Sequence, residues 1–153
     1  MGGMRALLIV LLVSILCACA GAQGDAAVGE RVLHWDELRD GIDPYDMQVE
    51  SGIVLADEGQ WEAWAATLPE SMAVPQVESI KAVDVDDAVL VVVSYRGCEP
   101  GSELRHAGSG ALEHRLLEDG SVACEAERQV VEVWQVPLDE LDVGRHDVVL
   151  LEG

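Results

Sequence analysis

The chain has 153 residues, and its 29 acidic residues against 9 Lys and Arg give a net charge of −20 at pH 7. This length is that of one domain, and it is enough to bury an ordinary hydrophobic core. The excess of negative charge argues against nucleic acids and anionic lipid head groups as partners of the domain surface.

The first residues predict export. Arg5 precedes an uninterrupted apolar run over residues 6–16, which is the plan of a secretory signal peptide. In a helix that rises 1.5 Å per residue, such a run reaches about half of a hydrocarbon core of roughly 30 Å. A signal peptide is therefore favoured over a permanent transmembrane helix.

The run ends in Leu16-Cys17-Ala18-Cys19, which resembles the lipobox of bacterial lipoproteins. The resemblance implies that residues 1–18 are removed, that Cys19 carries the lipid, and that residues 19–29 form a flexible tether. The protein is then expected outside the cytoplasm, in the cell envelope, and anchored to a membrane through Cys19. The alternative is ordinary cleavage after Ala20 or Ala22, which would release a secreted protein.

Residues 30–153 are expected to form a single domain. Its first predicted elements are a strand over residues 47–56, bent at Ser51-Gly52, and a helix with Asp57 as its N-cap. Gln60 stands three residues after Asp57, as in a capping box. The helix carries one apolar stripe at helical spacing, made of Trp61, Trp64, Ala65 and Leu68.

Short strands are predicted beyond the helix. The β-branched run over residues 88–95 indicates a central strand buried on both faces, preceded by an extended segment at 79–85. Turn signals separate a meander over residues 103–107, 111–117 and 122–127, and closing strands are expected at 129–136 and 146–151, with a turn at 137–141. The prediction is an α+β fold, a mainly antiparallel sheet with one main amphipathic helix; the alternative is an all-β sandwich.

Two cysteines remain after either cleavage, Cys98 and Cys124. In an oxidising compartment such a pair is most simply a disulfide, which would stabilise the fold by about 3 to 4 kcal/mol. A reactive or metal-binding pair is the alternative, but no CxxC spacing or paired histidine motif supports it.

Signatures of enzymes are missing from the sequence, which contains no GxSxG, HExxH, phosphate-binding glycine loop or EF-hand spacing. We therefore predict a protein that is not an enzyme, with no catalytic residue, cofactor or metal site. His106 and His114 flank a predicted hairpin, and a zinc or copper site between them is the alternative to histidines that face solvent, but the sequence identifies no further ligand. Histidines facing solvent are the preferred interpretation; His34 and His146 stand alone.

Two aspartate clusters and two tryptophans are further candidates for ligand sites. Weak calcium binding is the alternative at each cluster, but aspartates in turns more often accept hydrogen bonds from local backbone amides. The clusters are Asp40, Asp43 and Asp46, and Asp84, Asp86 and Asp87. A ligand groove lined by Trp61 and Trp64 is the alternative for the tryptophans, but their helical spacing favours packing in the core.

The helix motif Glu58-Gly-Gln-Trp61-Glu-Ala-Trp64 and the strand motif Val83-Asp-Val-Asp-Asp-Ala-Val-Leu-Val-Val-Val resemble the PrcB family of protease-complex subunits. The resemblance implies a noncatalytic adaptor that binds an envelope protein, and it carries over no functional residue. The expected function is thus a protein-binding module on a lipoprotein. A solute- or metal-binding lipoprotein is the alternative, and an envelope enzyme comes third.

Overall fold

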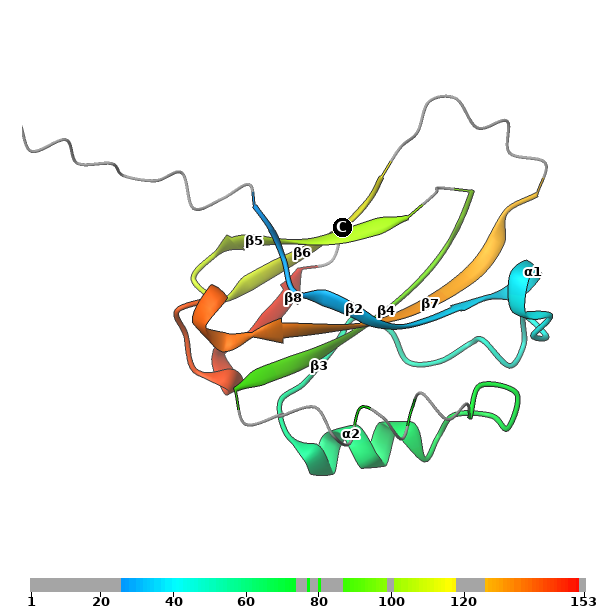
Figure 1. Ribbon diagram of the computed structural model, residues 1–153, viewed down its shortest axis with the longest axis horizontal. Helices are drawn as coiled ribbons and strands as arrows, with labels where there is room; N and C mark the ends of the chain where they lie inside the picture. Colours follow the sequence, from blue (N-terminus) through cyan, green and yellow to red (C-terminus); the bar gives the residue numbers. More distant parts are fainter. Residues whose placement is uncertain are drawn as a thin grey trace, which may run out of the picture.

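A computed structural model of the chain describes residues 26–73, 77, 80, 87–98, 101–117 and 126–151. Two four-stranded sheets and one longer helix make up this part (Figure 1). Sheet A has the order β1 (Ala27–Val28), β5 (Ser102–Gly108), β6 (Ala111–Leu116) and β8 (Val149–Leu151). Sheet B has the order β2 (Glu30–Asp36), β7 (Arg128–Pro137), β4 (Ala88–Gly97) and β3 (Ile53–Leu55).

The described helical elements are one longer helix and three short ones. Helix α2 (Glu58–Ala65) lies on the face of sheet B that is turned away from sheet A (Figure 1). The short elements are α1 (Glu37–Asp40), η2 (Leu138–Glu140) and η3 (Arg145–Asp147). The predicted α+β class is confirmed, although the strands are divided between two sheets, as in the sandwich alternative. All strand pairs are antiparallel except β6 with β8.

Sheet B separates two hydrophobic cores. Side chains alternate along β4, so Val89 and Val91 pack against sheet A while Leu90 and Val92 pack towards α2. All four are at most 1% exposed, which confirms the prediction of a central strand buried on both faces. We call the layer between the sheets the inner layer, and the layer between sheet B and α2 the outer layer.

Helix α2 forms as its sequence predicts. The carboxylate of Asp57 accepts a hydrogen bond from the backbone N–H of Gln60 at 2.9 Å, and the Gln60 side chain accepts one from the N–H of Ala56. Trp61 and Trp64 are buried with their ring centroids 5.3 Å apart, so the prediction that they belong to the core is confirmed.

Several predicted boundaries are wrong. The strand expected over residues 47–56 is reduced to β3, because Gly52 takes a left-handed conformation with φ of 75°. The last strand is shorter than expected, since η3 occupies residues 145–147. β1 pairs with β5 inside the segment assigned to the tether. Two predicted segments fall largely outside the described residues. These are residues 122–125 of the strand predicted over 122–127, and the segment 79–85 except Ile80.

β2 and α1 were not predicted. In β2, Leu33 and Trp35 pack into the outer layer and β7 provides the paired strand. Asp36 ends the strand and caps α1, accepting hydrogen bonds from the N–H groups of Leu38 and Arg39. In the part of the chain that the structure describes, no helix is long and apolar enough to cross a membrane.

Candidate functional site

The inner layer contains a buried carboxylate. Glu132 lies in the middle of β7, between Val131 and Val133, and its side chain is 0% exposed. Because neighbours on a strand point to opposite faces, Glu132 faces sheet A while the two valines pack into the outer layer.

Side chains from four strands converge on this carboxylate. Oε1 accepts from Arg31 Nη1 at 2.7 Å, from His34 Nδ1 at 3.0 Å and from the Tyr95 hydroxyl at 3.4 Å. Oε2 accepts from the Ser102 hydroxyl and from Trp134 Nε1, the latter at 3.1 Å. Together these residues form the Glu132 cluster: Arg31, His34, Tyr95, Ser102, Glu132 and Trp134. Ser102 belongs to sheet A, so the cluster joins the two sheets.

The hydrogen bonds keep the carboxylate charged. Burial alone raises the pKa of Glu132, but hydrogen bonds from His34, Ser102 and Arg31 outweigh it and lower the pKa to about 2. Burial, followed by the negative charge of Glu132, raises the pKa of Tyr95 to about 12. At neutral pH the cluster therefore holds an anionic glutamate and a neutral tyrosine.

The bonding pattern limits the chemistry of the cluster. An ionised carboxylate only accepts hydrogen bonds, so His34 donates through Nδ1–H. In a serine hydrolase the histidine stands between the serine and the acid. Here Ser102 and His34 both donate to Glu132, and this arrangement does not activate the serine as a nucleophile. The cluster is built to hold a charge between two sheets.

His106 and His114 come from neighbouring strands, as predicted. The β5–β6 register pairs Leu104 with His114 and His106 with Leu112, which places both imidazoles on the face of sheet A that is turned to sheet B. Their Nε2 atoms are buried and have no hydrogen-bond partner among the described residues, so the prediction of histidines facing solvent is wrong for this pair. Burial lowers the pKa of His114.

The acidic groups of the first cluster have different partners. Asp40 pairs with the Arg39 guanidinium at 2.9 Å, Asp43 accepts from the N–H of Tyr45, and Asp46 accepts from the Ser71 hydroxyl, 25 residues away. The hydrogen bond from Arg39 lowers the pKa of Asp40. The preferred turn interpretation is thus confirmed for Asp43, whereas Asp40 lies in α1 and Asp46 bonds to a distant side chain. Among the described residues no group of three or more His, Cys, Asp or Glu is arranged to hold a metal ion; Asp84 and Asp86 lie outside them.

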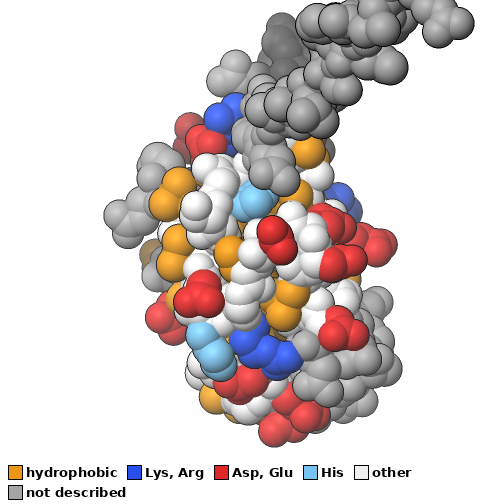
Figure 2. Space-filling view, turned by 90° about the vertical axis from the view of Figure 1, so that its left-hand side faces the viewer, with side chains coloured by type: hydrophobic (Ala, Val, Ile, Leu, Met, Phe, Trp, Pro, Cys, Tyr) orange, Lys and Arg blue, Asp and Glu red, His pale blue; other side chains and the backbone are white. Residues whose placement is uncertain are grey.

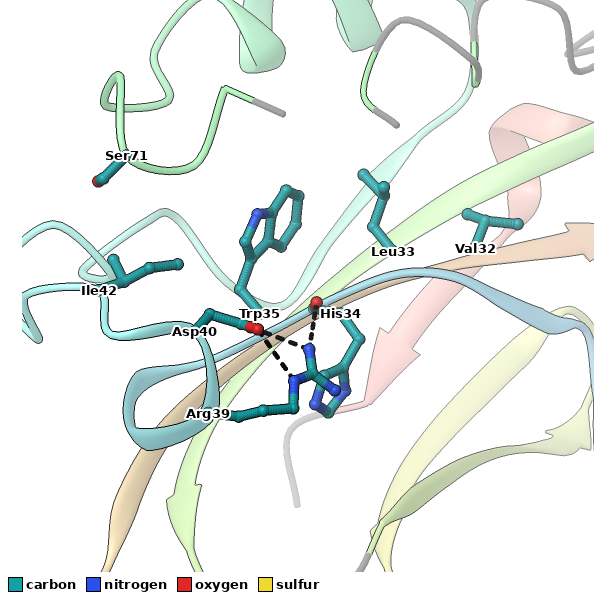
Figure 3. Close-up of a pocket in the computed structure, with 8 residues that line it drawn as sticks. All are labelled: Val32, Leu33, His34, Trp35, Arg39, Asp40, Ile42 and Ser71. Atoms are coloured by element: carbon teal, nitrogen blue, oxygen red, sulfur yellow. Dashed lines mark hydrogen bonds and ion pairs between the residues drawn. The ribbon is translucent and has the colours of Figure 1, made fainter. Parts of the chain in front are cut away.

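A cavity of about 290 Å³ opens beside β2, at the margin of the outer layer (Figure 3). Four consecutive residues of β2 and four residues from α1 and the loops line it. We call it the edge cavity. Its lining residues are Val32, Leu33, His34, Trp35, Arg39, Asp40, Ile42 and Ser71. The side chains of Val32, Leu33 and Trp35 project to the same side, with Ile42 and Ser71 across from Trp35.

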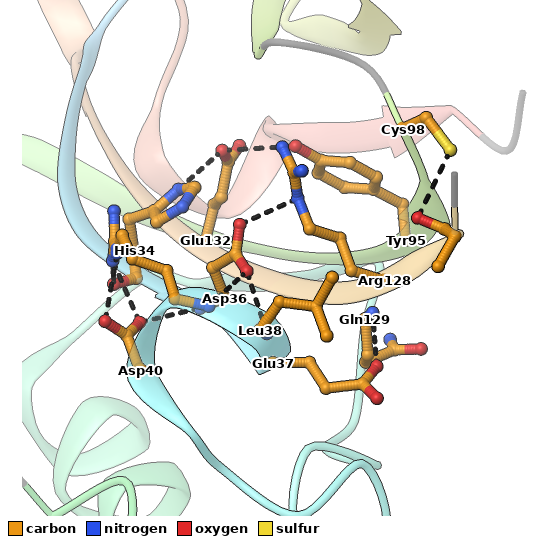
Figure 4. Close-up of polar contacts among 12 residues, drawn as sticks. His34, Asp36, Glu37, Leu38, Asp40, Tyr95, Cys98, Arg128, Gln129 and Glu132 are labelled. Carbon is orange, nitrogen blue, oxygen red and sulfur yellow. Dashed lines mark hydrogen bonds and ion pairs between the residues drawn. The ribbon is translucent and has the colours of Figure 1, made fainter. Parts of the chain in front are cut away.

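Polar contacts hold α1, which contributes Arg39 and Asp40 to the lining of this cavity (Figure 4). Asp36, 6% exposed, forms an ion pair with Arg128, whose Nε lies 2.7 Å from a carboxylate oxygen, and Glu37 accepts a hydrogen bond from the backbone N–H of Gln129 at 2.9 Å. α1 is therefore attached to the first residues of β7. Arg39 also donates to the backbone carbonyl of His34 at 3.1 Å.

The predicted disulfide and lipid anchor stay predictions. Cys98 Sγ lies 3.5 Å from the backbone carbonyl of Ala126, which stands two residues after Cys124 in the sequence (Figure 4). The register of β4 with β7, which pairs Gly97 with Arg128, accounts for this proximity. Cys124 and residues 1–25, with Cys19, lie outside the described residues.

Comparison with protein-family profiles, curated proteins and solved structures finds no match to this chain. The site therefore has to be interpreted from its own geometry.

Sequence reasoning missed both the Glu132 cluster and the edge cavity. A signal for the cluster was present, because Glu132 interrupts the apolar run Val130-Val131-Glu132-Val133-Trp134 of a strand with valines on both sides. A charge at such a position must be paired. The edge cavity has no local signal, since it depends on how residues 39–42 and 71 come to lie beside β2.

Proposed function

We propose that this protein is a membrane-anchored, extracytoplasmic lipoprotein whose domain works as a noncatalytic protein-binding or adaptor module. The observation that carries the binding role is the edge cavity, which combines an apolar floor with a charged rim. Leu33, Trp35 and Ile42 provide the floor, and the Arg39–Asp40 pair lies at the rim. An apolar cavity with a few placed polar groups is the usual form of a binding site.

Exposed apolar side chains support the same surface. Leu38 and Tyr45 are 61% and 80% exposed; neither lines the edge cavity, but they stand one residue before Arg39 and three residues after Ile42, which do. Large apolar and aromatic side chains are typical anchors of protein interfaces.

The size of the cavity is compatible with a protein ligand. At about 290 Å³ the edge cavity lies at the lower end of the roughly 300–1,000 Å³ typical of small-molecule pockets. One or two side chains of a partner fit such a volume. The Glu132 cluster supports a noncatalytic role, because its carboxylate is saturated with hydrogen bonds and its pKa of about 2 leaves it a poor proton carrier at neutral pH.

Two measurements test this function. The intact mass of the chain extracted from membranes of its native host is expected to correspond to a chain beginning at lipidated Cys19. An unlipidated chain with residues 1–18 retained would contradict the anchor.

The binding role is tested with photo-crosslinking amino acids at Asp43, beside the cavity, and at Ala63, on the exposed face of α2. We expect a defined protein adduct in the native envelope. The absence of any adduct at both sites, or hydrolysis of peptide, ester or glycoside substrates that is lost on mutating one residue, would contradict the adaptor role.

A further inference from the structure

The edge cavity lies along the backbone of β2 and not only on one face of it. Val32, Leu33, His34 and Trp35 all line the cavity, although the His34 ring points to the opposite face of the sheet (Figure 3). Neighbours on a strand alternate between faces, so a cavity that touches four in a row reaches the main chain. The register shift between Arg31 and Leu33 adds to this by bringing Val32 and Leu33 to the same side.

β2 is the first strand of sheet B, and within the described residues no strand pairs with its outer edge. Free strand edges pair readily with other chains, and proteins protect them with bulges and charged side chains. β2 has both devices, the register shift and Arg39, which donates to the carbonyl of His34. Arg39 is 58% exposed, so it covers this acceptor with a side chain that can swing away.

Charge selects the kind of segment that fits. Exposed carboxylates surround the cavity: Asp40 lines it, Asp43 and Glu70 stand next to lining residues in sequence, and Asp46 accepts a hydrogen bond from the lining residue Ser71. Arg39 is the one Lys or Arg among the lining residues, and Asp40 neutralises it. Figure 2 shows further acidic side chains, with hydrophobic ones between them, on another face of a molecule whose net charge is −20. A segment with flanking Lys or Arg is therefore attracted to this edge.

We propose that the outer edge of β2 binds an extended segment of a partner protein as an added strand, with an apolar side chain in the edge cavity and basic residues on either side. The proposal rests on the proposed adaptor function and names its recognition mode. Main-chain hydrogen bonds provide the affinity in strand addition, and the pocket provides the specificity.

The first test uses synthetic peptides and the full chain purified from membranes in detergent. The probe is a labelled peptide, acetyl-Lys-Thr-Val-Leu-Val-Thr-Lys-amide, followed by fluorescence anisotropy. Saturable binding is expected at a Kd below about 1 mM, weakened about tenfold when Leu is replaced by Ser or when both Lys are replaced by Glu. Lack of saturation, or equal binding of the three peptides, overturns the proposal.

Variants of the protein locate the site. Ser71→Trp fills the mouth of the cavity and is expected to weaken binding about tenfold, whereas the same substitution at an exposed position outside the cavity, Ala63→Trp, leaves binding unchanged. Arg39→Ala uncovers the carbonyl of His34 and should tighten binding. Circular dichroism checks that the variants are folded. Equal Kd values for Ser71→Trp and Ala63→Trp place the peptide elsewhere and overturn the proposal.

Strand addition has a signature of its own. N-methylation of the peptide amides that face β2 removes binding, whereas N-methylation of the alternate amides does not. Peptides of both kinds that bind equally contradict an added strand. If the chain alone forms dimers that Ser71→Trp dissociates, the edge binds a second copy, and the partner named here is wrong.

The outcomes separate this inference from the adaptor function. A protein adduct at Ala63, together with no peptide binding at β2, leaves the adaptor function standing and removes the strand-addition site. The absence of adducts at both Asp43 and Ala63 removes the adaptor function itself.

Discussion

The two faces of sheet B solve the problem of burial in different ways. In the inner layer, Glu132 brings a charge between the sheets and five side chains saturate its carboxylate. In the outer layer, large apolar side chains fill the core, among them Trp35, Trp61 and Trp64. The packing is incomplete beside β2, where the edge cavity lies. The inner layer is closed by hydrogen bonds, and the outer layer is open at one margin.

This difference separates stability from function in the molecule. A buried ionised group demands fixed geometry, because each lost hydrogen bond leaves a desolvated polar atom. Apolar packing tolerates a gap at its margin, since a missing contact there costs only the dispersion energy of the lining atoms. Recognition is therefore expected at the open margin, and the inner layer is expected to hold the sheets together.

Glu132→Ala is expected to cause the largest loss of stability in the inner layer. Removing the carboxylate leaves the guanidinium of Arg31 and the buried donors Ser102 and Trp134 without their acceptor. The free energy of unfolding should fall by about 3 to 5 kcal/mol in urea titrations. Glu50→Ala, at an exposed position, is the control and should change stability by no more than about 0.5 kcal/mol. Equal, small effects of both substitutions would contradict a central role for the cluster.

The same carboxylate predicts how stability depends on pH. The pKa of Glu132 lies near 2 in the folded chain and at the ordinary value of 4.5 in the unfolded chain, so the unfolded chain binds the proton first. Its contribution, about 3 kcal/mol, is complete above pH 4.5 and is lost as the pH falls to about 2. Urea titrations between about pH 6 and pH 2 measure the loss. Glu132→Gln removes this titration, and an acid profile as steep as that of the natural chain would refute the assignment.

Matched truncations compare the closed and the open layer directly. Leu112 is fully buried between the sheets, whereas Ile42 lines the edge cavity. Leu112→Ala should destabilise by about 4 kcal/mol and Ile42→Ala by about 2 kcal/mol, because Ile42 already lacks neighbours on its cavity side. Thermal and urea unfolding measure both. A larger cost at Ile42 than at Leu112 would mean that the margin of the outer layer is as tightly packed as the inner layer.

The elements that the sequence predicted well are those with a local signal. The valines of β4, the cap and stripe of α2, and the Gly108-Ser109-Gly110 turn each encode their structure in a few neighbouring residues. The turn is an example of such a local signal. All three of its residues have positive φ, and glycine, which occupies two of the three positions, adopts this conformation without strain.

What was missed depends on contacts between distant residues. β2 carries Arg31, His34 and Asp36 among its apolar positions, and these make sense only once Glu132 and Arg128 are beside them. The same holds for His106 and His114, whose hairpin was predicted but whose inward direction follows from the packing of sheet A on sheet B. The edge cavity needs Ile42 and Ser71 next to β2, which no spacing in the sequence reports.

The smallest expected effect on stability concerns α2, which covers the outer layer. Asp57→Ala removes the acceptor for the N–H of Gln60 and should cost about 1 kcal/mol, whereas Asp57→Asn keeps an oxygen and should cost less. Because the cap acts on the first turn of α2, amide hydrogen exchange should accelerate over Glu58–Ala65 more than in β7, at the centre of sheet B. Equal acceleration in α2 and β7 would show that the helix unfolds only together with the sheets. The outer layer would then not be the more independent of the two.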